Sequence, residues 1–119
     1  MLNALADHTK IYIACGYTDL RKQIDGLAAV VVEVFGQDPC QANALYLFCG
    51  RRSDRFKALY WEGDGFMLLY KRLENGRFQW PRTPSEVRKL TSQQLRWLLE
   101  GLTVDPKKQI KKGMKGRVI

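Results

Sequence analysis

Cationic and aromatic side chains are interleaved in residues 48–66, the stretch FCGRRSDRFKALYWEGDGF. Guanidinium and ammonium groups neutralise phosphates and release their counterions, and exposed aromatic rings stack on unpaired bases. This stretch therefore makes nucleic-acid binding the first functional hypothesis. The alternative is a hairpin with an ordinary core face and a solvated, charged edge.

The acidic residues offer less for catalysis. Asp54 lies among arginines, where an ion pair is the simpler interpretation, and Glu62 and Asp64 lie in a glycine-rich turn. A two-metal nuclease needs several carboxylates that converge on its ions. His8 is the only histidine, which disfavours a histidine-based nucleophile. We therefore predict no catalytic residue, no metal site and no cofactor, and keep a metal-dependent nuclease using Asp54, Glu62 or Asp64 as a weaker alternative.

The net charge of +8 is distributed unevenly over the 119 residues. Residues 106–119 contain six Lys or Arg and no acid, whereas residues 1–105 have nearly balanced charges. We predict one globular domain over 1–105 and a flexible basic tail over 106–119. The tail is either an electrostatic arm for nucleic acid or only a solubilising end.

Cysteine usage and hydropathy favour a cytoplasmic protein. The three cysteines form no CxxC pair, which suits a reducing compartment. Cys15 and Cys49 end apolar runs, and we expect both to be small buried residues. The chain has no apolar stretch of the roughly 18 residues that a membrane helix needs, and its start does not resemble a signal peptide.

Apolar patterning in the first half predicts a strand, a helix and a second strand. KIYIACG, residues 10–16, is typical of a strand, and ALYLFCG, residues 44–50, is apolar enough for the centre of a sheet. Between them, the spacing predicts a helix that Thr18 or Asp19 caps and that ends at Gly36.

The second half predicts a three-stranded antiparallel meander over residues 55–80. A four-residue EGDG loop would pair Trp61 with Phe66. Asn75-Gly76 is a strong two-residue hairpin signal, because both positions of a type I′ turn need positive φ.

Two capping-box patterns then predict C-terminal helices. Thr83 with Glu86 marks one helix in TPSEVRKL, and Thr91 with Gln94 marks another in TSQQLRWLLEGL. The expected fold class is a small α+β domain whose antiparallel sheet contains the meander. One N-terminal helix and the C-terminal helices pack on that sheet.

Side-chain alternation divides the predicted meander into two faces. One face is almost wholly apolar and should pack on the helices: Phe56, Ala58, Tyr60, Met67, Leu69, Lys71, Leu73, Phe78 and Trp80. The other mixes cations with aromatics: Arg55, Lys57, Leu59, Trp61, Phe66, Leu68, Tyr70, Arg72, Arg77 and Gln79. It is either a binding surface or a second core layer with cations at the strand ends. A three-residue loop at 63–65 would exchange the faces of the first strand.

Three blocks carry a family resemblance: CGYTDLRKQIDGLAAVV, LYLFCGRRSDRFKALYWEGDGFMLLYKRLENGRFQWP and LTSQQLRWLLEGL. They resemble TnpB-type accessory proteins, the second open reading frame product of the insertion sequence sixty-six family of bacterial transposable elements. The resemblance runs from about Lys10 to Leu102 and departs mildly, as at Leu20, Ser53 and Glu62. It implies a role in transposition, with strand cutting left to a separate transposase.

Two binding hypotheses combine the resemblance with the residue pattern. The leading one is a non-catalytic accessory factor that binds DNA at the element ends. Its candidate residues are Arg51, Arg52, Arg55, Lys57, Lys71, Arg72, Arg77, Arg82, Lys107, Lys108, Lys111 and Lys112. The second is a protein-interaction module in which Trp61, Phe66 and Tyr70 dock on the cognate transposase or on a second copy. Neither hypothesis requires a membrane.

Overall fold

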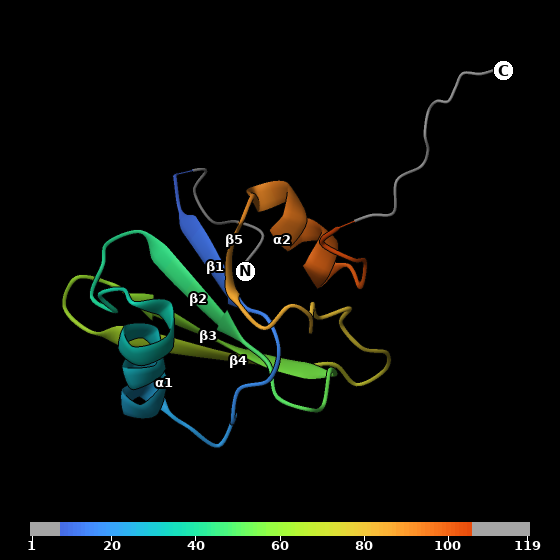
Figure 1. Cartoon of the computed structure of the whole chain (residues 1–119), viewed down its shortest axis with the longest axis horizontal. Helices are drawn as coiled ribbons and strands as arrows, with labels where there is room; N and C mark the ends of the chain where they lie inside the picture. The colour runs from blue at the N-terminus through green and yellow to red at the C-terminus, as the bar shows by residue number, and fades with distance from the viewer. Residues whose placement is uncertain (1–7, 106–119) are drawn as a thin grey trace, which may run out of the picture.

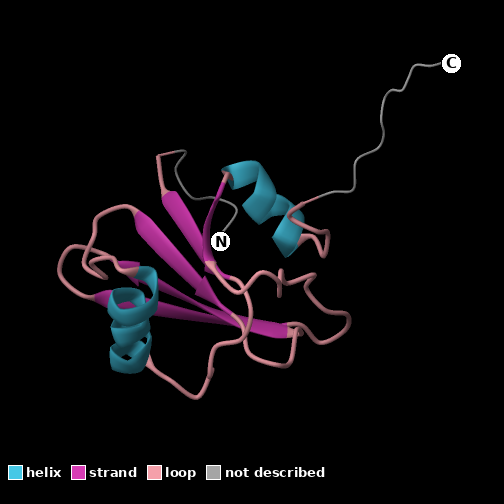
Figure 2. Ribbon diagram, in the orientation of Figure 1, coloured by secondary structure: helices cyan, strands magenta, loops and turns pink. Residues whose placement is uncertain are grey.

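The computed structural model describes residues 8–105, in which one mixed sheet of five strands has helical elements on both faces (Figures 1 and 2). The strand order is β4-β3-β2-β1-β5. β1 and β2 are parallel and are joined through α1 and η2, whereas the other neighbouring pairs are antiparallel. The elements are β1 (Lys10–Ala14), α1 (Ile24–Val30), η2 (Val31–Phe35), β2 (Ala44–Phe48), β3 (Arg55–Trp61), β4 (Phe66–Arg72), β5 (Val87–Leu90) and α2 (Ser92–Leu99).

The first two predicted strands are confirmed as β1 and β2. Every residue of β2 is buried, as expected for the central strand of a sheet covered on both faces. Cys15 and Cys49, which follow β1 and β2, are both buried and free, while Cys40 is exposed.

The β3–β4 hairpin has the predicted register, with Trp61 opposite Phe66. In its turn, the Glu62 amide donates to the Gly65 carbonyl at 2.9 Å. Gly63 takes a positive φ of 95°, a conformation that side chains with a Cβ rarely adopt. The register places alternate side chains of each strand on opposite faces.

The predicted third strand of the meander, residues 77–80, is wrong. Gly76 does adopt a positive φ of 83°, but the chain after it does not pair with β4. Instead the Phe78 amide donates to the Ser53 carbonyl at 2.7 Å, and the Trp80 indole donates to the Ala14 carbonyl at 3.0 Å. The side chains of Phe78 and Trp80 are buried against the sheet. These contacts hold residues 77–80 in place without the backbone pairing that a strand next to β4 would have. The antiparallel meander is therefore β2–β3–β4.

The helix predicted over residues 83–90 is also wrong, because Val87–Leu90 forms β5 and pairs with the free edge of β1. Pairing with a distant strand overrides the local Thr83–Glu86 pattern. The next capping box is confirmed at α2. Thr91 accepts from the Gln94 amide at 3.1 Å, and Gln94 accepts from the Thr91 amide at 2.9 Å. Residues 8–105 thus contain a single C-terminal helix.

The N-terminal helix starts later than predicted. Its N-cap is Gln23, without a side-chain capping bond, so neither Thr18 nor Asp19 caps it. The Thr18 amide is instead bound to the Cys49 carbonyl at 2.8 Å, which ties residues 15–23 to the end of β2. The helix continues through η2, a turn of π-helix, and ends at Gly36 with a positive φ of 67°, as predicted.

Two core layers lie on opposite faces of the sheet. Phe56, Ala58, Phe78 and Trp80 pack with Leu95 and Leu98 of α2 on the face predicted to be apolar. The other face is the one that α1 covers (Figure 1). There Leu59, Phe66 and Leu68 pack in a second cluster with Leu27 of α1 and Val31 of η2. The second-core-layer alternative is therefore confirmed for these three residues. Among the cations predicted on that face, Arg55 and Arg72 lie at strand ends, Lys57 is buried within β3, and Arg77 lies outside the strands. The α+β class is confirmed.

The predicted basic tail, residues 106–119, lies outside the described residues. The boundary between domain and tail stays a prediction. Among residues 8–105, no helix is long and apolar enough to cross a membrane.

Candidate nucleic-acid interface

A groove of about 790 Å³ opens at the edge of the sheet where β1 and β2 end. Because these strands are parallel, the loops that follow them meet at the same edge. β3 begins and β4 ends there, because both pair antiparallel with their neighbours. The lining includes five cations and two tyrosines: Arg21, Arg51, Arg52, Arg55, Lys57, Tyr17 and Tyr70.

Backbone contacts hold the two loops of the groove together. Gly50 approaches the first loop closely, since a Cβ at this position would lie 3.2 Å from the Thr18 carbonyl oxygen. The buried Cys49 thiol donates to the Arg55 carbonyl at 3.2 Å, within the turn that leads into β3. Burial raises the pKa of this thiol above its ordinary value, so it stays protonated at neutral pH.

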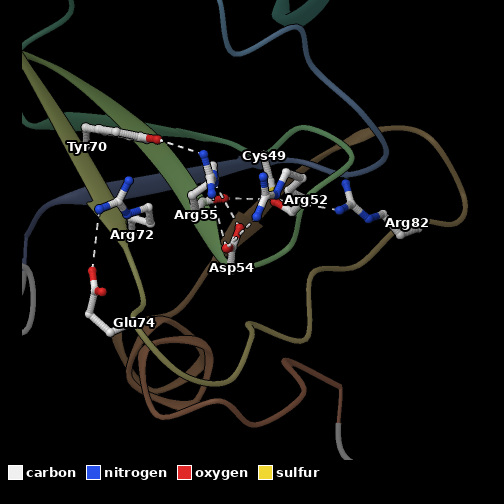
Figure 3. Close-up of polar contacts among 8 residues, drawn as sticks. All are labelled: Cys49, Arg52, Asp54, Arg55, Tyr70, Arg72, Glu74 and Arg82. Atoms are coloured by element: carbon white, nitrogen blue, oxygen red, sulfur yellow. Dashed lines mark hydrogen bonds and ion pairs between the residues drawn. The ribbon is translucent and has the colours of Figure 1, made fainter.

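Asp54 organises two of the arginines (Figure 3). Arg55 donates through Nε to Asp54 Oδ1 at 2.9 Å and through Nη2 to Oδ2 at 3.2 Å. Arg52 contacts the same carboxylate at 3.5 Å. The hydrogen bonds from Arg55, followed by the charges of both arginines, hold the pKa of Asp54 below its ordinary value. The predicted ion pair of Asp54 is confirmed.

The arginines differ in what they leave free for a ligand. Arg55 is committed to Asp54, and its Nη1 also lies 3.4 Å from the Tyr70 hydroxyl. Arg52 keeps 71% of its side chain exposed despite its long contact to Asp54. Arg51 is exposed, and within residues 8–105 it has no ion-pair partner. Arg51 and Arg52 therefore have the donors available for phosphate.

Arg82 holds the wall of the groove that Tyr17 forms. Its Nη1 donates to the Gly16 carbonyl at 2.6 Å. Its Nη2 donates to the Cys49 sulfur at 3.6 Å, a contact visible in Figure 3. Its guanidinium carbon lies 4.3 Å from the centroid of the Tyr17 ring, and that of Arg51 lies 5.8 Å away. This cation–π arrangement orients Tyr17 at the rim.

Asp19 and Arg21 form an ion pair on the same rim. The Arg21 guanidinium donates to both carboxylate oxygens, and the Arg21 amide donates to Oδ1 at 3.0 Å. The Arg21 side-chain hydrogen bonds, followed by that backbone bond, lower the pKa of Asp19 to about 2. The carboxylate is therefore charged at neutral pH and neutralises Arg21.

Lys57, a predicted DNA-binding residue, is 7% exposed. Its Nζ donates to the Lys22 carbonyl at 2.9 Å and lies 5.7 Å from the Tyr70 ring centroid. Its ammonium group therefore lies at the inner wall of the groove and is bound to the loop before α1. This geometry assigns Lys57 a role in holding the groove together.

The other predicted DNA-binding residues are more dispersed. Arg72 is exposed and paired with Glu74 at 3.5 Å. Lys71 is exposed on β4, on the face opposite the groove, and Arg77 is exposed in the irregular segment after it. Lys107, Lys108, Lys111 and Lys112 lie outside the described residues.

The three predicted partner-binding residues do not form one surface. Trp61 and Phe66 contact each other edge to face at 4.9 Å beside the hairpin turn. Phe66 also packs against the core under α1. Tyr70 lies toward the other end of β4 and lines the groove.

Sequence reasoning missed Tyr17, Thr18 and Arg21 as groove residues. Their signal was an aromatic residue directly after the glycine that follows the first strand, with a cation four residues further on. The helix predicted from residue 18 concealed it, because a helical Arg21 would point away from the strand ends.

The acids of the nuclease alternative lie at opposite ends of β3. Asp54 precedes the strand, whereas Glu62 and Asp64 follow it. The seven residues of β3 lie between Asp54 and Glu62, so the two acids are roughly 26 Å apart at about 3.3 Å per residue. No group of three or more His, Cys, Asp and Glu within residues 8–105 is placed to hold a metal ion. This geometry does not favour the proposed carboxylate cluster.

The fold and the groove define a small α+β protein with an arginine- and tyrosine-lined edge. A family model described as IS66 Orf2 like protein matches residues 9–109, and the chain belongs to this family. The resemblance to the insertion sequence sixty-six proteins is thereby confirmed.

Two relatives from Sinorhizobium fredii agree with this assignment. The protein y4hO is 36% identical over 95 residues, which cover 80% of this chain and 82% of the relative. The protein y4jC is 30% identical over 93 residues, which cover 78% and 79%. The names of the family and of these relatives specify no enzymatic activity. No solved structure matches the chain.

Proposed function

We propose that this protein is a non-catalytic accessory factor for transposition and that it binds DNA through the groove at the ends of β1 and β2. Membership of the IS66 Orf2-like family supports the role in transposition. The observation that favours DNA is the clustering of Arg51, Arg52 and Arg55 between two tyrosines.

The ion pairs and hydrogen bonds of the groove arginines determine which of them can bind phosphate. Asp54 neutralises one positive charge, and Asp19 neutralises that of Arg21. Arg51 and Arg52 remain able to contact phosphates and release counterions. Arg82 and Lys57 hold the walls in position and add positive potential without leaving their internal contacts.

The test compares two double variants of equal charge change. Arg51→Glu with Arg52→Glu reverses the free cations of the groove. Lys89→Glu with Arg96→Glu reverses two exposed cations of β5 and α2, elsewhere on the molecule. Affinity for DNA of the element ends is measured by fluorescence anisotropy, and folding is checked by circular dichroism.

The groove variant should lose at least tenfold in affinity, because two phosphate contacts and their counterion release disappear. The control variant should lose much less. Equal losses of DNA affinity in both variants would indicate that the protein binds DNA only through general attraction between opposite charges. Unchanged affinity in a folded groove variant would exclude the groove.

A second candidate function is docking on the cognate transposase or on a second copy of the chain. The half-buried Trp61–Phe66 pair favours it, because aromatic anchors are common at protein interfaces and this pair lies at the hairpin turn, away from the groove. Co-purification with the transposase that is lost on Trp61→Ala, with DNA affinity retained, would support docking. Retained co-purification would exclude this residue as the anchor.

A further inference from the structure

Two exposed tyrosines bound the arginines of the groove. Tyr17 is 65% exposed and Tyr70 is 54% exposed, and both line the groove. Tyr17 follows β1, whereas Tyr70 is near the end of β4, so the rings come from opposite sides of the cluster. Large exposed rings beside free cations are the combination that single-strand binding proteins use.

Internal contacts hold both rings in place. Arg82 lies against the Tyr17 ring and is bound to the Gly16 carbonyl. The Tyr70 hydroxyl accepts from Arg55, which Asp54 holds on its other side (Figure 3). Because these partners restrict the rings before a ligand arrives, stacking costs less conformational entropy.

The dimensions of the groove suit unpaired nucleotides. β4 and β1 are three strand spacings apart, roughly 14 Å at about 4.8 Å each, which is about the length of four stacked bases. A volume of about 790 Å³ is in the range of sites that enclose small ligands. Inside a double helix the base faces are stacked on one another, so only the two terminal base pairs have a free face for Tyr17 or Tyr70.

We infer that the groove binds an unpaired stretch of DNA, with bases stacked on Tyr17 and Tyr70 and phosphates at Arg51 and Arg52. This inference rests on the proposed function, DNA binding at the groove, and adds the form of DNA that is bound. Stacking tolerates any base, because every base has a π-face. The site therefore selects unpaired strands over duplex without reading their sequence.

The test uses the full chain and three DNA probes of mixed sequence: a single strand, the same strand in a blunt duplex, and that duplex with a single-stranded extension. The variants are Tyr17→Ala and Tyr70→Ala, with Tyr17→Phe as the matched control because it keeps the ring. Both tyrosines are exposed, so removal of either ring should leave the fold intact. The double variant Arg51→Glu with Arg52→Glu is measured on the same probes.

The single strand and the extended duplex should bind more tightly than the blunt duplex. Each alanine variant should lose roughly five- to 150-fold in affinity for the single strand and the extended duplex, and little for the blunt duplex. Tyr17→Phe should bind like the wild type.

Equal affinity for single strand and blunt duplex, with neutral alanine variants, would overturn the inference. The proposed function would survive that result if Arg51→Glu with Arg52→Glu still weakened binding. Wild-type affinity of that double variant on all three probes would overturn both.

Discussion

At the scale of single residues, the partners of each cation decide what it can do. Arg55, Arg82 and Lys57 are bound to groups of the protein itself, whereas Arg51 and Arg52 keep free donors. All five were predicted to bind DNA, because a sequence shows which residues are charged but not which groups they are hydrogen-bonded to. The structure separates residues that build the groove from those available to a ligand.

Lys57→Met tests this division. The variant keeps most of the apolar stem but removes the hydrogen bond from Nζ to the Lys22 carbonyl. We expect the free energy of unfolding to fall by about 1 kcal/mol, measured by urea denaturation. Lys71→Met, at an exposed position of β4, should change it much less.

DNA affinity provides the complementary readout for Lys57. Lys57→Met should weaken binding less than Arg51→Met, because the Lys57 ammonium is already bound inside the protein. A larger loss of affinity in Lys57→Met, with unchanged stability, would place Lys57 among the ligand contacts and contradict the assignment.

The Asp19–Arg21 pair predicts a specific titration. Its hydrogen bonds lower the pKa of Asp19 from 3.8 to about 2. Since the pKa in the folded protein lies below that of the unfolded chain, the pair stabilises the folded rim above pH ~4 and this contribution is lost as the pH falls toward 2.

Carboxyl NMR checks this titration directly. Asp19 should titrate with a midpoint near 2 in the wild type, and Arg21→Ala should move the midpoint up toward 3.8. Arg96→Ala, on α2, should leave it in place. An ordinary midpoint in the wild type would show that the rim pair does not form in solution.

At the scale of elements, local signals predicted structure correctly where the partners are also local. The β3–β4 register follows from one four-residue loop, and the α2 capping box lies within four residues. A helix was predicted where β5 forms, because the partner of β5, the strand β1, lies more than 70 residues earlier in the chain. The burial of Phe78 and Trp80 was predicted from side-chain alternation, but their hydrogen bonds to the distant Ser53 and Ala14 carbonyls were not.

Contacts between residues distant in sequence also determine which side chains line the groove, so the groove could be predicted only in part. Arg51, Arg52 and Arg55 are close in sequence, so a local pattern could identify them. Tyr17 joins them only because β1 and β2 are parallel, which brings the loops after both strands to the same edge. No local pattern predicts that α1 covers Leu59 on the other half of the same face.

The capping box of α2 gives a prediction about stability. Thr91→Ala removes the side-chain acceptor of the Gln94 amide and should lower the free energy of unfolding by about 0.5–2 kcal/mol, measured by urea denaturation. Ser92→Ala, at the exposed first helical position, is the matched control and should be nearly neutral. Equal effects of the two substitutions would indicate that the capping box contributes little.

At the scale of the whole molecule, the sheet separates two kinds of surface. Most of both faces is covered by α1, α2 and the segment around Phe78, so little sheet remains for a partner. The groove lies at the edge of the sheet where β1 and β2 end, and exposed arginines and tyrosines line it. The proposed function therefore concerns this edge and not a broad sheet face.

Residues 106–119 are the competing source of DNA affinity, because they carry six of the basic residues and no acid. A basic segment attracts any nucleic acid by counterion release. The central claim is that recognition of DNA resides in the groove, whereas the tail lysines add an affinity that does not discriminate between single strands and duplex.

The most direct measurement of this claim is a salt-dependent binding titration on the full chain with Lys107, Lys108, Lys111 and Lys112 replaced by Gln. The probes are DNA of the element ends, unrelated duplex and single strands. The claim predicts weaker binding to all probes, a smaller salt slope, and a retained preference for single strands over duplex, which Arg51→Glu with Arg52→Glu removes. Binding that loses every preference with the four lysines would contradict it and leave the transposase-docking role.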